Sequence, residues 1–225
     1  MDYSATRDRV EHYFDRSATQ VWERLTSDAP VSGVRATVRA GRDRMRATML
    51  SCLPDDLRGA RVLDAGCGAG QMVAELAARG ADVVGVDISP ALLDIADRRL
   101  PDELRSRVVL QSGDMFSPHL GSFDAVVAQD SMIYYRSADL AEKLDALSER
   151  APKVVFTVAP RTPFLMAFFG VGKLFPRSDR SPVMIPQDTA RLAGLVAGDL
   201  REVERITSGF YISTCLELRA GEVRA

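Results

Sequence analysis

The sequence predicts an α/β fold: a Rossmann-like, doubly wound and mostly parallel seven-stranded sheet, with a C-terminal antiparallel hairpin and an N-terminal helical cap. Three observations predict it. Short apolar runs rich in β-branched residues alternate with helical stretches between residues 61 and 158. A glycine-rich turn directly follows the first run. Near the C-terminus, two runs of alternating polarity flank Ser208-Gly209. Parallel strands covered on both faces, closed by a hairpin at one edge, satisfy all three.

The first fifty residues show helical spacing. Apolar side chains recur three and four positions apart around Val10 and again from Val34 to Met49, with a break at residues 27–30. We therefore predict a helical cap over residues 1–55. Residues 56–225 form the main domain, in which 160–198 are predicted to be an insertion on the substrate side.

Strands and helices then alternate. The Ser89-Pro90 pair predicts a helix start, because serine is a favoured N-cap and proline fits the first turn. Gly80 is expected to end the preceding helix, and Ser137 to cap a later one. The predicted strands are 61–65, 82–87, 108–110, 123–128, 153–158, 202–206 and 211–218, and the predicted helices after the cap are 71–79, 91–100 and 137–149.

The composition excludes several classes of protein. A formal net charge of -2 gives no bulk attraction to nucleic acid. The three cysteines are far apart and only two histidines occur, so we expect no metal site and a reducing compartment. The polar N-terminus does not resemble a signal peptide. The apolar stretch 163–175 is shorter than the roughly 20 residues that span a bilayer.

The glycine-rich turn Asp64–Gly70 reads Asp-Ala-Gly-Cys-Gly-Ala-Gly. It lacks the lysine of a phosphate-binding P-loop, and Gln71 stands where a dinucleotide fingerprint has its third glycine. Asp64 would repel a pyrophosphate but would suit a cation. S-adenosylmethionine fits, because it carries a sulfonium and an ammonium and has no phosphate. We predict contacts from Asp64, Gly66, Gly68 and Gly70, with Cys67 lending its backbone N–H.

Two further carboxylates follow the next strands. Asp87 lies about 20 residues beyond the turn, the usual spacing for an acid that accepts ribose hydroxyls. Asp114 could accept from the adenine amino group, with Met115 against the ring. Ile88 and Gln129 complete the predicted cofactor site. Arg39 or Arg42, of which we favour Arg39, could pair with the cofactor's carboxylate.

Several stretches together resemble the magnesium protoporphyrin IX O-methyltransferases of bacteriochlorophyll synthesis, within the class I methyltransferases. They run from residue 10 almost to the C-terminus and include 13–16, 22–24, 38–42, the glycine-rich turn, 130–135 and 156–163. The most specific is Gly172–Pro182, which general class I enzymes do not share. The resemblance implies an enzyme that methylates one propionate of magnesium protoporphyrin IX, giving the monomethyl ester.

For the site, we predict that Tyr13 and Tyr134 are neutral hydrogen-bond donors at the transfer site, able to orient a carboxylate. Plant and cyanobacterial relatives carry histidine in place of Tyr134, so a histidine-based role does not transfer. Arg161, Lys173, Arg177 and Arg180 border the apolar stretch and could meet the second propionate.

The resemblance also implies partners and a location. The substrate would come from the porphyrin-binding subunit of magnesium chelatase and pass to the ring-forming cyclase. The protein would be cytoplasmic, with peripheral contact to the photosynthetic membrane through 163–175 as one role for that stretch; a wall of the porphyrin cleft is another. Two alternatives remain: an O-methyltransferase for a quinone precursor or other small molecule, and a non-catalytic S-adenosylmethionine-binding assembly factor.

Overall fold

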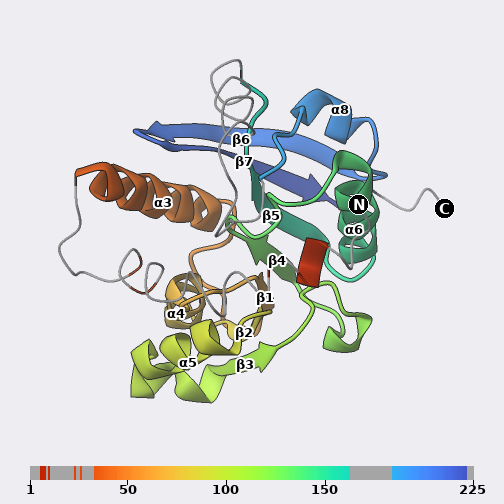
Figure 1. The fold of residues 1–225 in the computed structure, drawn as a ribbon. Helices are drawn as coiled ribbons and strands as arrows, with labels where there is room; N and C mark the ends of the chain where they lie inside the picture. Colours follow the sequence, from red (N-terminus) through yellow and green to blue (C-terminus); the bar gives the residue numbers. More distant parts are fainter. Residues whose placement is uncertain are drawn as a thin grey trace.

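A central seven-stranded sheet organises the protein (Figure 1). The computed structural model describes residues 6–8, 10, 23, 26, 33–162 and 184–221. The strand order is β3-β2-β1-β4-β5-β7-β6. The strands are β1 (Arg61–Ala65), β2 (Asp82–Asp87), β3 (Val108–Ser112), β4 (Ala125–Ala128), β5 (Lys153–Val158), β6 (Asp199–Ser208) and β7 (Tyr211–Arg219).

The first five strands are parallel, and β7 pairs antiparallel with both β5 and β6. The chain therefore passes the position next to β5, forms the edge strand β6, and returns through Gly209 as β7. This confirms the predicted doubly wound sheet with its C-terminal hairpin. The strand order reverses between β1 and β4, which is where ligands bind in open α/β sheets.

Helices cover both faces (Figure 1). One core packs helices against the sheet through Met45, Leu76 and Val127, and the other through Leu140, Phe156 and Leu192. The first face carries α3 (Gly33–Ser51), α4 (Gln71–Ala78) and α5 (Pro90–Arg99), and the second carries α6 (Ser137–Ser148) and α8 (Thr189–Ala193). None of the described helices is both long enough and apolar enough to cross a bilayer.

Local sequence signals explain most helix ends. Ser89 caps α5 by accepting from the N–H of Leu92, and Gly80 adopts φ 96° just after α4. The prediction for Ser137 was wrong: Arg136 is the N-cap of α6, and the Ser137 hydroxyl donates to Gln187 Oε1 at 2.7 Å. A partner 50 residues away competes successfully for that hydroxyl.

Several boundaries also differ from the prediction. The edge strand β6 extends over Asp199–Ser208, twice the predicted length, because it pairs along most of β7. β4 begins at Ala125 rather than at residue 123, whereas β3 continues to Ser112. The sequence patterns also missed α8 and two short 3-10 helices, η2 (Asp102–Arg107) and η3 (Pro118–Leu120). None of these is long enough to show a helical period.

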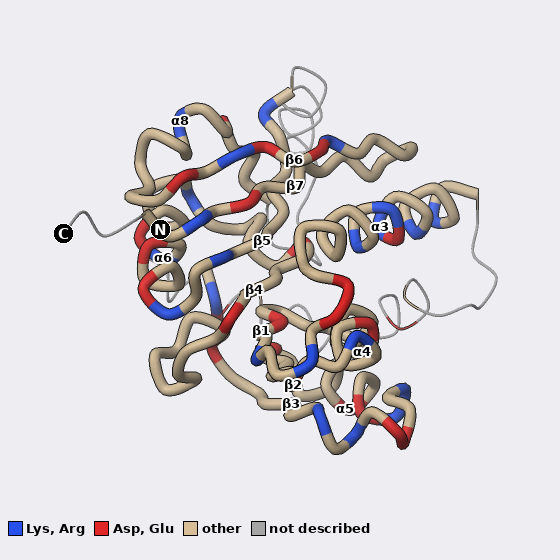
Figure 2. Tube along the Cα trace, turned by 180° about the vertical axis from the view of Figure 1, so that it is seen from behind, with Lys and Arg blue, Asp and Glu red and all other residues tan. Residues whose placement is uncertain are grey.

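Helix α3 packs mainly on the C-terminal hairpin (Figure 1). It is rich in arginine along its length (Figure 2). Gly41 allows the close approach, since a Cβ there would lie 2.6 Å from Cδ1 of Tyr211 on β7. Towards its C-terminal end, Thr48 and Arg44 both donate to Glu204 on β6. These contacts bring the N-terminal region to the carboxyl ends of the central strands.

Candidate functional site

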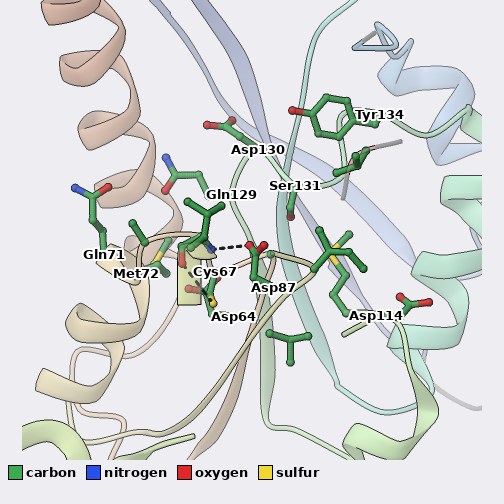
Figure 3. A pocket seen from close by; sticks show the side chains of 18 of the residues that line it. Asp64, Cys67, Gln71, Met72, Asp87, Asp114, Gln129, Asp130, Ser131 and Tyr134 are labelled. Carbon is green, nitrogen blue, oxygen red and sulfur yellow. Dashed lines mark hydrogen bonds between the residues drawn. The ribbon is translucent and has the colours of Figure 1, made fainter. Parts of the chain in front are cut away.

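A pocket opens at the carboxyl ends of β1, β2 and β4, beside the reversal in strand order, and Figure 3 shows side chains that line it. It encloses about 1000 Å³, part of it open to solvent. The residues that line it come from five parts of the chain: Arg7, Val10, Thr26 and Arg42; Asp64, Gly66–Ala69, Gln71 and Met72; Val86–Ile88 and Leu92; Gly113–Met115; and Gln129–Ser131, Tyr134 and Tyr135.

The glycine-rich turn forms the floor of the pocket. The backbone N–H groups of Gly66 and Cys67 both donate to the carbonyl of Val86, at 2.7 and 3.0 Å, which ties the end of β1 to the end of β2. Gly66 has φ 82° and Gly68 has φ 52°, conformations that glycine adopts without strain. A Cβ at Gly68 would meet no atom within 4 Å. The turn thus presents bare backbone to the cavity, which suits close contact with a ligand.

Asp64 is a buried carboxyl at the base of this turn. Its side chain is 1% exposed, and among the described residues Oδ2 has no hydrogen-bond partner. Burial, with Asp87 nearby, raises its pKa to about 8. An unsatisfied buried oxygen is costly, so it marks a place where a ligand donor would be stabilised. A cationic ammonium beside Asp64 would satisfy the oxygen and favour its ionised form.

Asp87 is the last residue of β2 and Asp114 follows β3, and both face the same pocket (Figure 3). Asp87 Oδ2 accepts from the N–H of Gly68 at 2.8 Å, and Oδ1 accepts from the N–H of Ser89 at 2.9 Å. A carboxylate has about four lone-pair sites, and these two bonds use one on each oxygen. Asp114 is fixed by the N–H of Phe116 at 2.9 Å. In Figure 3 it lies on the far side of Asp87 from Asp130.

The opposite end of the pocket holds an ion pair. Arg42 of α3 donates to Asp130 Oδ2, and both residues line the cavity. Sequence reasoning missed Asp130, Ser131, Gln71 and Met72. Asp130 has φ 57° and is the one residue other than glycine with positive φ among those described. Such strain clusters at functional sites, but only coordinates show it.

The other predicted cofactor residues differ in position. Ile88, Met115 and Gln129 line the pocket, and the Gln129 amide donates to the carbonyl of Arg42 at 2.9 Å. Gly70 caps α4 with φ 81° and is outside the lining set. Arg39 is also outside that set, whereas Arg42, the other arginine considered, belongs to it. A ligand contact from Arg39 or Gly70 stays a prediction.

Of the two predicted catalytic tyrosines, the structure describes one. Tyr134 lines the pocket and belongs to a buried cluster with Ile133, Ile95 and neighbouring side chains, against which Val10 packs. Tyr13 lies outside the described residues. So do Lys173, Arg177 and Arg180, the cations predicted to border the apolar stretch.

The thiol of Cys67 is in an environment that makes it unreactive. Burial, together with the carboxyl groups of Asp64 and Asp87, raises the pKa of its thiol well above the usual value. The thiol therefore stays protonated at neutral pH, and a protonated thiol is a poor nucleophile. This agrees with the prediction that Cys67 is a small turn residue and not a nucleophile. The backbone N–H of Cys67, which was predicted to serve the cofactor, instead donates to the carbonyl of Val86. No group of three or more potential metal-ligating side chains occurs in the described part of the chain.

Comparison with known proteins identifies the family. The chain is 60% identical over 220 residues to a magnesium-protoporphyrin O-methyltransferase from Rhodobacter capsulatus, covering 97% of this chain and 98% of the relative. The chain belongs to the magnesium-protoporphyrin O-methyltransferase family. Residues 128–220 match the family model described as magnesium-protoporphyrin IX methyltransferase C-terminus, and residues 62–150 match a general methyltransferase domain.

More distant relatives agree on the fold. The crystal structure of magnesium protoporphyrin IX methyltransferase from Synechocystis PCC 6803 with bound SAH superposes with a TM-score of 0.78 at 26% identity, covering 98% of this chain and 100% of that one. A ubiquinone biosynthesis O-methyltransferase from Xanthomonas oryzae is 32% identical, but over only 54% of this chain and 54% of its own length. Similarity to the magnesium-protoporphyrin O-methyltransferase from Rhodobacter capsulatus covers nearly the whole chain, whereas similarity to the ubiquinone biosynthesis enzyme covers about half of it.

Proposed function

We propose that this chain transfers the methyl group of S-adenosylmethionine to one propionate carboxylate of magnesium protoporphyrin IX, giving the monomethyl ester. The observation that carries the proposal is 60% identity to a magnesium-protoporphyrin O-methyltransferase over nearly the full length of both chains. The pocket suits that cosubstrate, because Asp64 offers a buried, unsatisfied oxygen to a cation and the turn offers open backbone at Gly68.

We assign the cofactor contacts along the pocket from one end to the other. Asp64 and the turn would hold the ammonium, Asp87 would accept the ribose hydroxyls, and Asp114 with Met115 would hold the adenine. Gln129 and Ile88 would border the methionine and ribose parts. Arg42 is better placed than Arg39 for the carboxylate, because it lines the cavity beside Gln129.

The reaction requires little acid–base catalysis from the protein. S-adenosylmethionine supplies a methyl group on a sulfonium, which leaves as a neutral thioether when a carboxylate oxygen bonds to the methyl carbon. A propionate with a reference pKa near 4 to 5 is already ionised at pH 7. The residues must therefore align the carboxylate and exclude water, and alignment can supply up to roughly 7–11 kcal/mol. Tyr134, and Tyr13 in the N-terminal segment, would orient the carboxylate as neutral donors.

The N-terminal segment would act as the cap that excludes water. Arg7, Val10 and Thr26 already line the pocket, and Arg99 of α5 donates to the carbonyl of Thr26 and to its hydroxyl, at 3.2 and 2.8 Å. Residues 1–55 would thus close the cofactor side. Residues 160–198 would provide the substrate side, with Arg161 and the other bordering cations near the second propionate.

The proposal extends to partners and location. A hydrophobic tetrapyrrole is best transferred by direct contact, so we propose handover from the porphyrin-binding subunit of magnesium chelatase. Peripheral attachment to the photosynthetic membrane through 163–175 belongs to the same proposal, since that stretch is largely apolar, follows Arg161 and contains Lys173 near its end.

A labelled-methyl assay tests the proposal. The protein is incubated with magnesium protoporphyrin IX and S-adenosylmethionine carrying a labelled methyl group, and the porphyrin is separated by chromatography. We expect label in a porphyrin monomethyl ester that alkaline hydrolysis removes. A parallel incubation replaces the porphyrin with a quinone precursor, and calorimetry measures binding of the cosubstrate. Label in the quinone precursor alone, or in neither acceptor although the cosubstrate binds, would contradict the proposal and favour one of the two alternatives.

A further inference from the structure

The ion pair between Arg42 and Asp130 joins parts of the chain that are far apart in sequence. Arg42 belongs to α3, and Asp130 follows β4, 88 positions later. Both side chains line the pocket and are largely shielded, with exposures of 15% for Arg42 and 10% for Asp130. The backbone of Arg42 is held as well, because its carbonyl accepts from the Gln129 amide at 2.9 Å.

Asp130 is itself fixed on its other side. Its N–H donates to the Thr157 hydroxyl at 2.7 Å, and that hydroxyl donates back to Oδ1 at 3.1 Å. The hydroxyl of Tyr211 donates to the same Oδ1 at 3.0 Å. Oδ1 is thus engaged by β5 and β7, while Oδ2 is engaged by Arg42 and, at 3.3 Å, also by the Tyr211 hydroxyl. Both oxygens of the Asp130 carboxylate therefore accept from protein donors, and one of these donors is the Arg42 guanidinium.

Tyr211 also fixes the helix that carries Arg42. Its ring packs against Gly41, where an added Cβ would lie 2.6 Å from Cδ1. Burial, together with Asp130, raises the pKa of the Tyr211 hydroxyl, so it remains a hydrogen-bond donor at any physiological pH. The C-terminal hairpin therefore contacts both the residue that pairs with Arg42 and the helix segment on which Arg42 sits.

We propose that Asp130 and Tyr211 are positioning residues that hold the Arg42 guanidinium for the α-carboxylate of the cosubstrate, and that this makes the site specific for ligands carrying that carboxylate. The inference rests on the proposed cofactor site and adds a specificity element to it. Asp64 at the floor and Arg42 at the end of the pocket then complement the two charges of an amino-acid zwitterion. An arginine fixed in advance loses less side-chain entropy when it forms a paired contact with a carboxylate.

The test compares two ligands that differ only in the carboxylate. One is S-adenosylhomocysteine, and the other is its decarboxylated analogue, which keeps the amine, the ribose and the adenine. Dissociation constants are measured by calorimetry for the unaltered protein and for Asp130→Asn, Tyr211→Phe and Glu204→Gln. Asparagine tolerates positive φ nearly as well as aspartate, so Asp130→Asn removes the charge with little backbone cost. Glu204→Gln is the matched control, because Glu204 binds another arginine of α3, outside the pocket.

We expect Asp130→Asn to weaken S-adenosylhomocysteine binding about tenfold or more, the usual effect of losing a charged partner, and to change the affinity for the analogue less than threefold. Tyr211→Phe should weaken only S-adenosylhomocysteine, by about threefold, since it removes one neutral hydrogen bond. Glu204→Gln should change neither affinity. Tyr211→Phe also keeps the test decisive if Asp130→Asn fails to fold, which circular dichroism would reveal.

Other outcomes overturn the inference in distinguishable ways. Equal losses for both ligands would mean that Asp130 supports only the general shape of the pocket. Tighter binding of S-adenosylhomocysteine by Asp130→Asn would mean that Asp130 competes with the ligand for Arg42. Equal affinity of the unaltered protein for the two ligands would overturn the inference and leave the proposed function standing. Failure of the unaltered protein to bind either ligand would overturn both.

Discussion

Two regions build the pocket in different ways. The turn Asp64–Gly70 is seven consecutive residues, and its geometry follows from glycines, a buried acid and two bonds to the adjacent strand. The contact between α3 and the C-terminal hairpin brings together residues as far apart as Thr37 and Ser208. The Ser208 hydroxyl donates to the carbonyl of Thr37, 171 positions earlier in the sequence. The first region is encoded locally, whereas the second exists only once the sheet has formed.

The two regions are expected to tolerate amino-acid substitutions differently. In the turn, backbone conformation is the constraint, so a single methyl group is expected to remove ligand binding. In the contact between α3 and the hairpin, the constraint is the fit of two surfaces, and a change is shared among several side chains. Substitutions in the turn should therefore have larger effects than substitutions at the contact between α3 and the hairpin.

The largest effect is expected from Gly66→Ala. A Cβ at this position would collide with the Ser131 side chain, and φ is 82°, so both packing and backbone oppose alanine. We expect at least a hundredfold loss of S-adenosylhomocysteine affinity by calorimetry, because the floor of the pocket must move. Gly68→Ala is the matched control for stability, since its Cβ meets nothing within 4 Å and only about 1 kcal/mol of backbone strain is added. Equal melting temperatures for the two variants would refute this account.

The second prediction concerns pH and Asp64. Its pKa is about 8, so most of this carboxyl is neutral at pH 7 and must lose a proton to pair with an ammonium. Affinity for S-adenosylhomocysteine should therefore rise between pH 6 and 8, by about tenfold per unit at most, and level off above pH 8. Calorimetry in buffers of different ionisation enthalpy should detect proton release at pH 7. Asp64→Asn should bind weakly and without this pH dependence.

The same shift affects the ligand-free protein in the opposite direction. The folded-state pKa of Asp64 lies above its value in the unfolded chain, so its contribution to stability is complete below about pH 4 and is lost as pH rises through 8. Asp64→Asn should accordingly melt at a higher temperature than the unaltered protein at pH 8, and the gap should narrow at pH 5. A constant gap across this range would show that burial of the charge is not the cause.

A smaller effect is expected at the contact between α3 and the hairpin. Alanine favours a helix by about 1 kcal/mol over glycine, but at Gly41 its Cβ would press on Tyr211 at 2.6 Å. We expect overpacking to win, with a net loss of about 1–2 kcal/mol in the free energy of unfolding and a several-fold loss of S-adenosylhomocysteine affinity. Gly33→Ala, with nothing within 4 Å at the start of the same helix, should cost no stability. Urea titration measures both variants.

The smallest effect distinguishes cysteines in the two regions. At the C-terminal end of α3, a hydrogen bond with Cys215 lowers the pKa of the Cys52 thiol to about 7, whereas burial raises that of Cys67 in the turn. Iodoacetamide at pH 8 should therefore label Cys52 about tenfold faster than Cys67, because the thiolate is the reactive form. Mass spectrometry of peptides after timed labelling measures the rates. Faster labelling of Cys67 would contradict its protected environment.

By itself, the sequence was sufficient to predict the sheet, the hairpin and the floor of the pocket. The alternation of strands and helices predicts a parallel sheet. This alternation can be recognised in the sequence, because hydrophobic periodicity and β-branching are properties of neighbouring residues. Three acids, Asp64, Asp87 and Asp114, each lie at or just beyond the end of a strand. Strands of a parallel sheet end at the same edge, so the three were expected to meet. The residues of the turn argued against a P-loop and a dinucleotide fingerprint from the sequence alone.

Only the tertiary structure decided which arginine faces the cavity and what holds it. Arg39 and Arg42 lie on one helix, and helical spacing cannot say which of them meets β4, because that depends on how α3 docks. The docking depends on Gly41 fitting against Tyr211, a match between two surfaces 170 residues apart that neither segment reveals alone. Likewise, the positive φ of Asp130 results from bonds to β5, β7 and α3 together, and no local pattern of residues records such a convergence.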